Sequence, residues 1–472
     1  MLGQVDIRML DDGEIEHINR VSIKVLSEVG VVVHHDELRR ILARNGARVE
    51  GECVKLPPQL IREALAMAPK VVRLADRRGK EMLLEEGNLI WAAGHNHYPQ
   101  VLDLDGSRHP TTVEDAIRMT RLIDTLPRFD VIHVVGGPLQ GVPAPVTNLR
   151  SIAIFFENSH KHGGACPCEV VDAEFWLDLA EITTKGGDLG REPTISMLVS
   201  TTSPLMLDPT ASQVMMEAIK RGVPIRGLPA PMAGATTPIT LAGTLVLMNA
   251  EMIFLVTAAQ CVREAAPVIY GGVGAVMNLK TGRISMGSPE FPMLTIAHAQ
   301  LGRYHQLPTY APVAVTDATR VDVQAGGEWM IQLIFAMASR LQYSLVSPSV
   351  DNGTVTSPEA LLLASDFLDI VARVFKGITV SEDTLAHEAI ARVGPGGHFL
   401  QDQHTFRNLR SGEHHYDGSF ERGGSLEPSD AALYRARERI NTILSQHVPD
   451  VSDAQVEEIE RYVDRRSKDL LR

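Results

Sequence analysis

The chain has little cysteine, little aromatic surface and no excess of positive charge. Four cysteines in 472 residues argue against a disulfide framework and are typical of the reducing cytoplasm. A net charge of −13 leads us to expect neither nucleic acid nor an anionic membrane as a partner. The segment from Met1 to Asp6 lacks a basic stretch followed by an apolar core, so we expect no signal peptide and a cytoplasmic protein.

Long apolar runs are also scarce, and one segment stands apart. Polar Asn249, Glu251 and Gln260 interrupt the segment Thr240–Val262, and Arg263 closes it. Such polar and charged groups are unfavourable in contact with lipid. The segment therefore predicts a helix buried between a core and its neighbours rather than a membrane span.

Short apolar runs that end at Gly, Pro or Asp and precede a helical stretch are abundant. Seven of them start 30 to 43 residues apart, namely Val131–Val135, Lys161–His162, Ile195–Val199, Ile225–Leu228, Pro267–Tyr270, Tyr310–Val315 and Tyr343–Val346. This spacing predicts an α/β fold of the TIM type, a (β/α)8 barrel. Either Leu89–Ala93 or Val101–Leu104 supplies the eighth strand. Barrels of this kind carry their chemistry on the loops that follow the strands.

Helical patterns flank the barrel on both sides, so we expect three parts. Residues 1–86 form an accessory helical region with a small hairpin, 87–380 the barrel, and 381–472 a C-terminal helical region with a Gly- and His-rich rim segment. The expected outer helices are Glu14–Val29, Asp36–Arg44, Pro58–Met67, Asp383–Arg392, Ser429–Ser445 and Asp453–Leu471, with the hairpin at Ala47–Leu56 and the rim segment at Gly394–Phe420.

Five stretches in collinear order resemble signatures of the trimethylamine:corrinoid methyltransferase family. They are Pro231–Gly243, Pro267–Gly272, Gly287–Glu290, Thr316–Gly326 and Gly394–Leu400. The similarity runs from about residue 15 to 445. The resemblance implies a TIM-type barrel that moves a methyl group from a methylated amine to the cob(I)alamin of a separate corrinoid protein.

The resemblance also bears on cofactors and partners. Archaeal members of the family use pyrrolysine, which this chain does not contain, so it is similar to the non-pyrrolysine branch, whose substrates are quaternary amines such as glycine betaine. Corrinoid-binding modules carry Asp-x-His-x-x-Gly. Here Asp402 and His404 match that pattern, but Arg407 stands where Gly is expected. We therefore expect a partner protein to bring the corrinoid, and a homo-oligomer of this chain.

Aromatic faces bind methylated cations through their quadrupoles. Tyr98 and Tyr270 are the leading candidates among the aromatic residues near strand ends, ahead of Tyr310, Tyr343 and Phe399. Packing in the core is the alternative role for each of them.

Carboxylates near the strand ends are candidates for stabilising the ammonium group. Asp317 follows the strand Tyr310–Val315, and Glu290 follows a family signature, so both are predicted catalytic residues. A loop-capping role for Asp317 and a helix-capping role for Glu290 remain open. Asp351 lies in a turn signal and is a further candidate for the substrate site.

Histidines and glycines complete the predicted substrate site. His162 closes one expected strand, and Gly271 and Gly272 close another, where they permit close approach of the backbone to a ligand. His398 and His404 lie in the Gly-rich segment, as a lid or an anchor on the rim. His160, Cys166 and Cys168 are of types that zinc prefers, but their spacing is unusual, and we expect no metal.

The chain departs from the family just after Asp317. The usual Asp-Ser-Lys continues here as Ala318 and Thr319, and the usual Gly-Tyr-Glu has Gly327 in place of Tyr. The leading hypothesis is a methyltransferase acting on a small quaternary or tertiary methylated amine. The alternative is a catalytically altered barrel that only binds a methylated amine, as a sensor or carrier.

Overall fold

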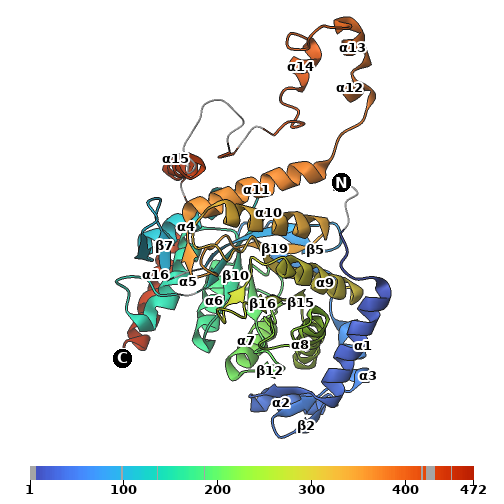
Figure 1. Cartoon of the computed structure of the whole chain (residues 1–472). Coiled ribbons are helices and arrows are strands. Elements are labelled where there is room, and N and C mark those ends of the chain that lie inside the picture. The colour runs from blue at the N-terminus through green and yellow to red at the C-terminus, as the bar shows by residue number, and fades with distance from the viewer. Residues whose placement is uncertain are drawn as a thin grey trace.

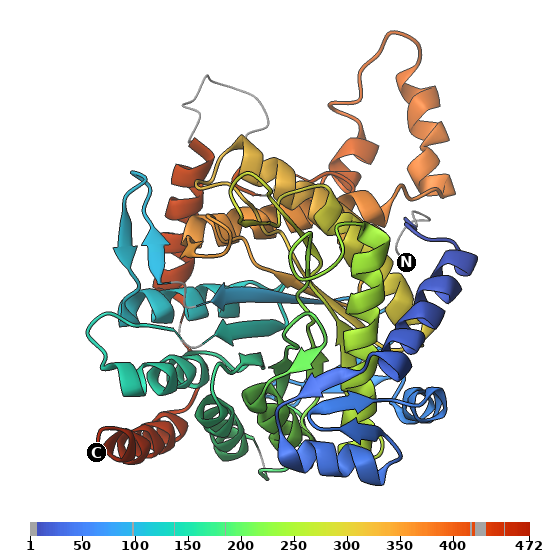
Figure 2. The ribbon, with the colours of Figure 1, turned by 60° about the horizontal axis from the view of Figure 1, so that its bottom comes forward.

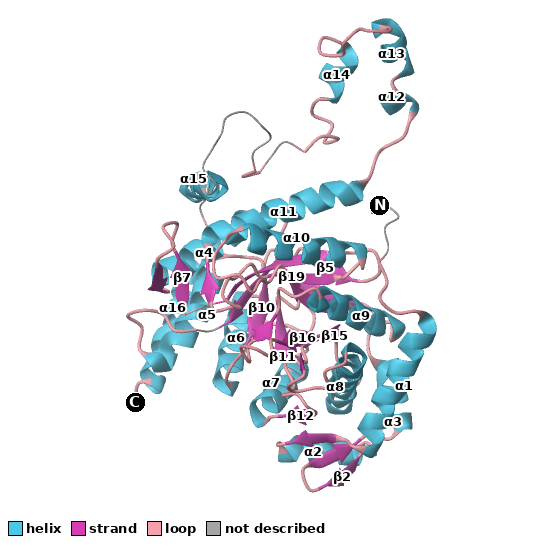
Figure 3. Cartoon of the chain, in the orientation of Figure 1, coloured by secondary structure: helices cyan, strands magenta, loops and turns pink. Residues whose placement is uncertain are grey.

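Eight parallel strands form a closed barrel at the centre of the molecule (Figures 1 and 3). The computed structural model describes residues 7–96, 99–135, 137–184, 186–415, 418–420, 431–447 and 449–472. Around the barrel the strand order is β10-β11-β13-β15-β18-β19-β6-β9. The strands are β6 Ile90–Asn96, β9 Val131–Val135, β10 His162–Cys166, β11 Ile195–Val199, β13 Ile225–Gly227, β15 Val268–Gly271, β18 Thr309–Val313 and β19 Tyr343–Val346. The predicted (β/α)8 barrel is confirmed.

Two details of the strand prediction are resolved by the structure. The eighth strand is β6, predicted as Leu89–Ala93, whereas the Val101–Leu104 region gives β7 Gln100–Leu102 in a small sheet outside the barrel. The prediction that a strand ends at His162 is wrong. That residue begins β10, in register with Val131 of β9, and the strand continues to Cys166.

Eight helices lie outside the strands, each following a barrel strand (Figure 2). They are α4 Val113–Thr125, α5 Ala144–Asn158, α6 Val170–Thr183, α7 Pro209–Lys220, α8 Leu241–Val262, α9 Glu290–Tyr304, α10 Val323–Ala338 and α11 Pro358–Lys376. By length and composition, α8 alone among the described helices resembles a membrane span, yet most of it is buried. It packs between the barrel and the N-terminal helices, as predicted.

The N-terminal region packs on α8 and also closes the end of the barrel at which the strands begin. Helices α1 Asp12–Glu28, α2 Asp36–Arg44 and α3 Pro58–Met67 and the predicted hairpin, β2 Arg48–Glu50 with β3 Cys53–Lys55, are present, together with β1 Val31–Val33. A second hairpin, β4 Val72–Ala75 with β5 Glu81–Leu84, was not predicted. Its apolar side chains share a core cluster with residues inside the barrel, so it plugs the end at which the strands begin.

Short strands lie at the opposite end of the barrel, where the barrel strands end. They are β8 Arg108–Pro110, which pairs with β7, β12 Met206–Leu207, β14 Met232–Ala233, β16 Ala275–Met277, β17 Ile284–Ser285 and β20 Val355–Thr356. These elements follow strands β6, β11, β13, β15 and β19 in the chain. We call this end the rim, because it is where a barrel of this type carries its site.

The C-terminal region both packs on the barrel and projects from it. Helix α15 Ala431–Gln446 packs on α11 and α4, and α16 Asp453–Leu470 packs on α5 and α6. Between them and α11 the described chain forms an arm, residues 378–415, that stands clear of the barrel (Figures 1 and 2). The predicted helix Asp383–Arg392 is broken in two at Ala386, giving α12 Glu382–Leu385 and α13 His387–Val393, and α14 Gln403–Asn408 follows.

Candidate active site

Asp317 holds two neighbouring pieces of the rim together. Its Oδ1 accepts the backbone N–H of Met286 at 2.8 Å, and the hydroxyl of Ser285 donates to its Oδ2. Its own N–H donates to Oε2 of Glu328 in α10 at 3.0 Å. Neither Asp317 nor Glu328 has a basic side-chain partner in the described chain. We call Ser285, Met286, Asp317 and Glu328 the rim clamp.

Asp351 lies beside the rim clamp but differs in its electrostatics. Its carboxylate pairs with Arg108 at 2.9 Å and Arg283 at 3.0 Å, and its N–H donates to the carbonyl of Ala318 at 2.7 Å. Hydrogen bonds from the two guanidinium groups lower the pKa of this carboxyl. Asp351 and Asp317 are thus brought together around residues 283–286, but Asp351 is already neutralised.

Glu290 occupies the first turn of α9, where an acid is favoured by the helix dipole. The helix begins at the rim, directly after Pro289. The structure therefore places Glu290 at the expected end of the barrel, in the position that its helix-capping role requires. Tyr98 lies outside the described residues.

Gly271 and Gly272 are required by the packing of the protein itself. A Cβ on Gly271 would lie 2.5 Å from the carbonyl oxygen of Gly227 and 2.5 Å from the Tyr310 ring. One on Gly272 would lie 2.7 Å from Nε2 of His298. Both glycines are at the rim end of β15, but close internal contacts already account for the absence of a side chain.

Tyr270 faces away from the barrel interior. It is buried, its hydroxyl donates to Oδ1 of Asn249 in α8 at 2.6 Å, and its ring packs on His298. Burial lowers the pKa of His298 to about 4 and raises that of Tyr270. The structure does not bring this tyrosine to the other predicted site residues.

His162 lies at the plugged end of the barrel, away from the rim. Its Nδ1 is 3.0 Å from the carbonyl oxygen of Ala75 in β4, and its Nε2 is 3.0 Å from Oγ of Ser196. A neutral ring that donates from Nδ1 and accepts at Nε2 satisfies both contacts. Burial lowers the pKa of His162 to about 3. These contacts fix the plug hairpin to the barrel.

His398 and His404 lie in the arm. Helix α11 begins beside β20 at the rim and runs 19 residues to the opposite end, and the arm leaves from there. A helix of this length spans roughly 28 Å. Within the arm, Nε2 of His404 lies 3.1 Å from the carbonyl oxygen of Asp383. The structure does not place the Gly- and His-rich segment on the rim.

The barrel interior holds a polar cluster that the sequence analysis missed as a unit. It consists of His133, Arg226, Tyr310 and Tyr343, all buried, and we call it the lumen cluster. Nη1 of Arg226 lies 3.0 Å from Nε2 of His133 and 3.3 Å from the Tyr310 hydroxyl oxygen, and Nε2 of His133 lies 2.7 Å from the Tyr343 hydroxyl oxygen. A charged residue inside the apolar run Ile225–Leu228 was the available signal.

The lumen cluster lies between the plug hairpin and the rim, because Tyr310 and Tyr343 share a core cluster with the apolar side chains of β4 and β5. Nη2 of Arg226 donates to the carbonyl of Ala165 at 2.7 Å and lies 3.8 Å from Sγ of Cys166, the last residue of β10. Burial alone would lower the pKa of Arg226, but the two tyrosines and Cys166 raise it overall. Burial raises the pKa of Tyr343 to about 12, so its phenol stays neutral.

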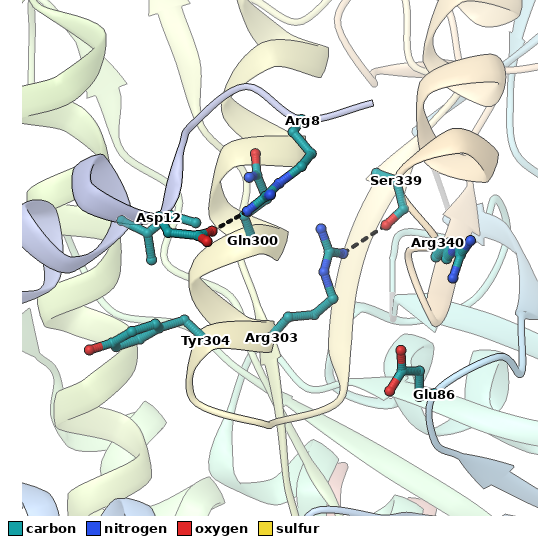
Figure 4. A pocket seen from close by; sticks show the side chains of 9 residues that line it. Arg8, Asp12, Glu86, Gln300, Arg303, Tyr304, Ser339 and Arg340 are labelled. Atoms are coloured by element: carbon teal, nitrogen blue, oxygen red, sulfur yellow. Dashed lines mark hydrogen bonds and ion pairs between the residues drawn. The ribbon is translucent and has the colours of Figure 1, made fainter. Parts of the chain in front are cut away.

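A hollow opens at the plugged end (Figure 4). It has a volume of about 370 Å³ and lies between the last turns of α9 and α10 and the start of α1. Arg303 donates to the carbonyl of Ser339 at 2.7 Å, and Arg8 pairs with Asp12. Its polar groups brace helix ends, so it is not the site expected at the rim.

The described His, Cys, Asp and Glu side chains do not form a metal-binding cluster. Among the described residues, the structure shows no group of three or more His, Cys, Asp or Glu side chains able to hold a metal ion. Cys166 is buried in the lumen, whereas Cys168 is exposed, and His160 lies 3.6 Å from Asp124.

Comparison with known proteins places this barrel among amine methyltransferases. The profile of the family described as Trimethylamine methyltransferase (MTTB) matches residues 3–470. Glycine betaine methyltransferase of Desulfitobacterium hafniense (strain Y51) is 28% identical over 472 residues, 98% of each chain. Trimethylamine methyltransferase MttB of Methanosarcina barkeri (strain Fusaro / DSM 804) is 28% identical over 99% of this chain and 97% of its own.

The solved structures agree on the fold. The monomethylamine methyltransferase MtmB of Methanosarcina barkeri superposes with a TM-score of 0.57 at 13% identity, covering 93% of this chain and 90% of that one. The barrel, its helical additions and the match over nearly the whole sequence lead to one assignment. The chain belongs to the trimethylamine methyltransferase family.

Proposed function

We propose that this protein is a methyltransferase that moves a methyl group from a small quaternary or tertiary methylated amine, resembling glycine betaine, to the cob(I)alamin of a separate corrinoid protein. The observation that carries the proposal is the family match over residues 3–470. Relatives named for glycine betaine and for trimethylamine match at similar identity, so the match supports the amine class rather than one amine.

Transfer of a methyl group from a quaternary amine requires little acid–base catalysis by the protein. The C–N bond breaks, the methyl group passes to the acceptor, and the nitrogen keeps the electron pair and leaves as a neutral tertiary amine. The protein must hold the cation, orient it and exclude water. We assign Asp317 to the electrostatic stabilisation of the ammonium group, because this carboxylate is fixed at the rim without a basic partner. Glu290, in the first turn of α9, is the second acid to which we assign a catalytic role.

We propose that the corrinoid arrives on a partner protein that docks at the rim. The corrinoid-like pattern around His404 lies in the arm, and Asp402 is engaged there with Arg392. This arrangement supports a carrier supplied in trans. Visible spectra of the purified protein after incubation with cobalamin test this, and stoichiometric retention of cobalamin by the isolated chain would contradict it.

A methyl-transfer assay tests the proposed activity. The purified protein is incubated with free cob(I)alamin and a panel of glycine betaine, dimethylglycine, choline, tetramethylammonium and trimethylamine, and methylcobalamin is followed by absorbance. Formation of methylcobalamin with at least one amine supports the proposal. Tight binding of an amine, measured by calorimetry, without methyl transfer would favour the sensor or carrier. The departures from the family pattern at Ala318, Thr319 and Gly327 support that alternative.

We also propose a homo-oligomer located in the cytoplasm. The arm exposes large apolar side chains, including Ile378, Leu400 and Phe406, each at least 65% exposed, which supports burial against another copy. The four cysteines are free, which supports a reducing compartment. Light scattering on the protein and on a triple variant with Ser at these three positions tests the first point. Cell fractionation tests the second.

A further inference from the structure

The turn that follows β19 has an unusual backbone. Asp351, Asn352 and Gly353 have positive φ angles of 53°, 54° and 82° in succession. A positive φ is unfavourable for a residue that carries a Cβ, and it normally occurs at single positions. Among the described residues, Asp351 and Asn352 are the only two neighbouring non-glycine residues with positive φ. We call residues 351–353 the left-handed turn. A backbone of this kind must be held in place by its surroundings.

The base of the left-handed turn is rigid. The N–H of Val350 donates to the carbonyl of Val355 at 2.9 Å, and the side chains of both residues are fully buried. They share a small apolar cluster with Leu102 of β7, against which Val321 packs. The three residues of the turn therefore contact the neighbouring rim loops from a fixed base.

Asp351 fixes the segment that carries Asp317. Its N–H donates to the carbonyl of Ala318, the residue after Asp317, at 2.7 Å. Its carboxylate pairs with Arg108 at 2.9 Å, and Nη2 of the same arginine donates to the carbonyl of Thr319 at 3.2 Å. The left-handed turn therefore holds this segment both directly and through a guanidinium group.

Asn352 and Gly353 fix the other side of the rim clamp. Nδ2 of Asn352 donates to the carbonyl of Ile284, which precedes Ser285. A Cβ on Gly353 would lie 3.8 Å from Cε of Met286, so the turn also packs beside that residue. Ser285 and Met286 are the two donors to the rim carboxylate. The left-handed turn thus contacts both of the segments that meet at that carboxylate.

We propose that Asp351 and Asn352 are positioning residues that act on the substrate only through Asp317. The inference rests on the proposed function and goes beyond it by assigning the left-handed turn a role. Asp351 is neutralised by Arg108 and Arg283, and Asn352 is uncharged, so neither is suited to bind an ammonium group itself. By joining the segments on both sides of Asp317, they fix the distance and direction of its carboxylate, on which productive geometry depends.

Hydrogen exchange in the free protein tests the inference without requiring any reaction. Asn352→Gly removes the side-chain donor, keeps the net charge and suits a positive φ. The amides of Met286 and Asp317 both donate within the rim clamp. Followed by mass spectrometry in the peptides that contain them, they should exchange about tenfold faster in this variant. Asp351→Asn, which weakens both ion pairs, should have the same effect.

Gln306→Gly is the matched control. Gln306 also has a positive φ, 57°, but it lies just after the end of α9, at the plugged end of the barrel. The control should leave exchange in the rim clamp unchanged, and unfolding curves establish that each variant is folded. Exchange that is unchanged in both turn variants would overturn the inference.

A mutant cycle in the methyl-transfer assay shows whether the turn acts through Asp317. Alone, Asn352→Gly should lower kcat about tenfold, because it misplaces the carboxylate. Combined with Asp317→Asn, it should change kcat by less than about twofold, because no charge remains to be positioned. A tenfold loss that persists in the Asp317→Asn protein would contradict the proposal.

Binding of an uncharged ligand provides a further readout. In 3,3-dimethylbutyrate, carbon replaces the ammonium nitrogen of glycine betaine. Its affinity, measured by calorimetry, should be the same in the unmodified protein and in Asn352→Gly, because nothing in it depends on the charge of Asp317. Equal weakening of glycine betaine and 3,3-dimethylbutyrate would assign the turn a general structural role and overturn the inference.

Failure of this inference is distinguishable from failure of the proposed function. Methyl transfer by the unmodified protein that Asn352→Gly leaves unchanged would overturn the positioning role and leave the methyltransferase intact. Faster exchange in the rim clamp of Asn352→Gly, with no methyl transfer from any amine by the unmodified protein, would support the role of the turn in holding Asp317 and overturn the proposed activity.

Discussion

The lumen cluster and the rim clamp belong to one barrel but have opposite charge. In the lumen a cationic Arg226 is enclosed by neutral aromatic side chains and carbonyl oxygens. At the rim, Asp317 and Glu328 are held by hydroxyl and amide groups, with no basic side chain paired to them in the described chain. The barrel is therefore positively charged inside and negatively charged at its mouth.

Protonation separates the barrel interior, with His133 in the lumen cluster and His162 at the plugged end, from the rim. Histidine in the unfolded chain takes up a proton near pH 6.5, whereas burial lowers the pKa of His162 to about 3 and that of His133 well below 6.5. The unfolded state therefore binds more protons as the pH falls from 6.5, and His162 alone lowers the free energy of unfolding by roughly 2 kcal/mol at pH 5.

Urea titrations at pH 7, 6 and 5 measure this dependence, and His162→Gln, which keeps a donor and an acceptor, should flatten it. A slope unchanged by this substitution would mean that the histidine is not neutral in the fold. The rim behaves differently. The pKa of Asp351 is lowered by Arg108 and Arg283, so its stabilising contribution is present above its unfolded value of 3.8 and is lost only as the pH falls further.

Gly271 stands where the two regions meet, and Gly271→Ala should destabilise the protein by about 3 kcal/mol. The added Cβ would lie 2.5 Å from a backbone carbonyl oxygen and 2.5 Å from the Tyr310 ring, and neither can move without disturbing the barrel. Chemical unfolding of both proteins measures the change. A difference below about 0.5 kcal/mol would show that the junction between lumen and rim is looser than the structure indicates.

Removing the rim charge should affect ligands according to their own charge. Asp317→Asn preserves an acceptor for the Met286 N–H but removes the negative charge, which we expect to be worth about 2 kcal/mol to a nearby ammonium, or roughly a thirtyfold loss in kcat/KM. Binding of 3,3-dimethylbutyrate, which has no positive charge, should be nearly unchanged. Equal weakening of both ligands would assign Asp317 a purely structural role.

The barrel was predictable because each strand is a local pattern. Apolar runs that stop at Gly, Pro or Asp located seven strands, and β6 is one of the two alternatives for the eighth. His162 was misplaced because Gly163 and Gly164 resembled a strand end. They are strand interior, and a Cβ on Gly163 would lie 2.9 Å from the ring of Trp176, while Gly164 packs against His133. Packing against distant bulky residues, rather than a turn, requires these two glycines.

The lumen cluster was not predictable because closure of the barrel creates it. Its four residues come from β9, β13, β18 and β19, and no local pattern joins them. Alternation along a strand shows that Ile269 and Tyr270 face opposite sides, but it does not tell which side is the interior. The position of the rim carboxylate Asp317 followed from its strand, whereas its partners Ser285 and Met286 come from a different loop.

The smallest expected effect lies at the rim, at Gly327, the glycine that replaces the tyrosine of the family pattern. A Cβ at this position meets nothing within 4 Å, and the residue lies inside α10, one position before Glu328 of the rim clamp. Gly327→Ala should therefore stabilise the protein by about 0.5 to 1 kcal/mol, through the lower helix propensity of glycine alone. Chemical unfolding measures the gain, and Gly271→Ala is the matched case in which the same added atom has no room. A destabilised Gly327→Ala would show that this face of α10 is covered, and the space left by the missing tyrosine would then belong to the site rather than to solvent.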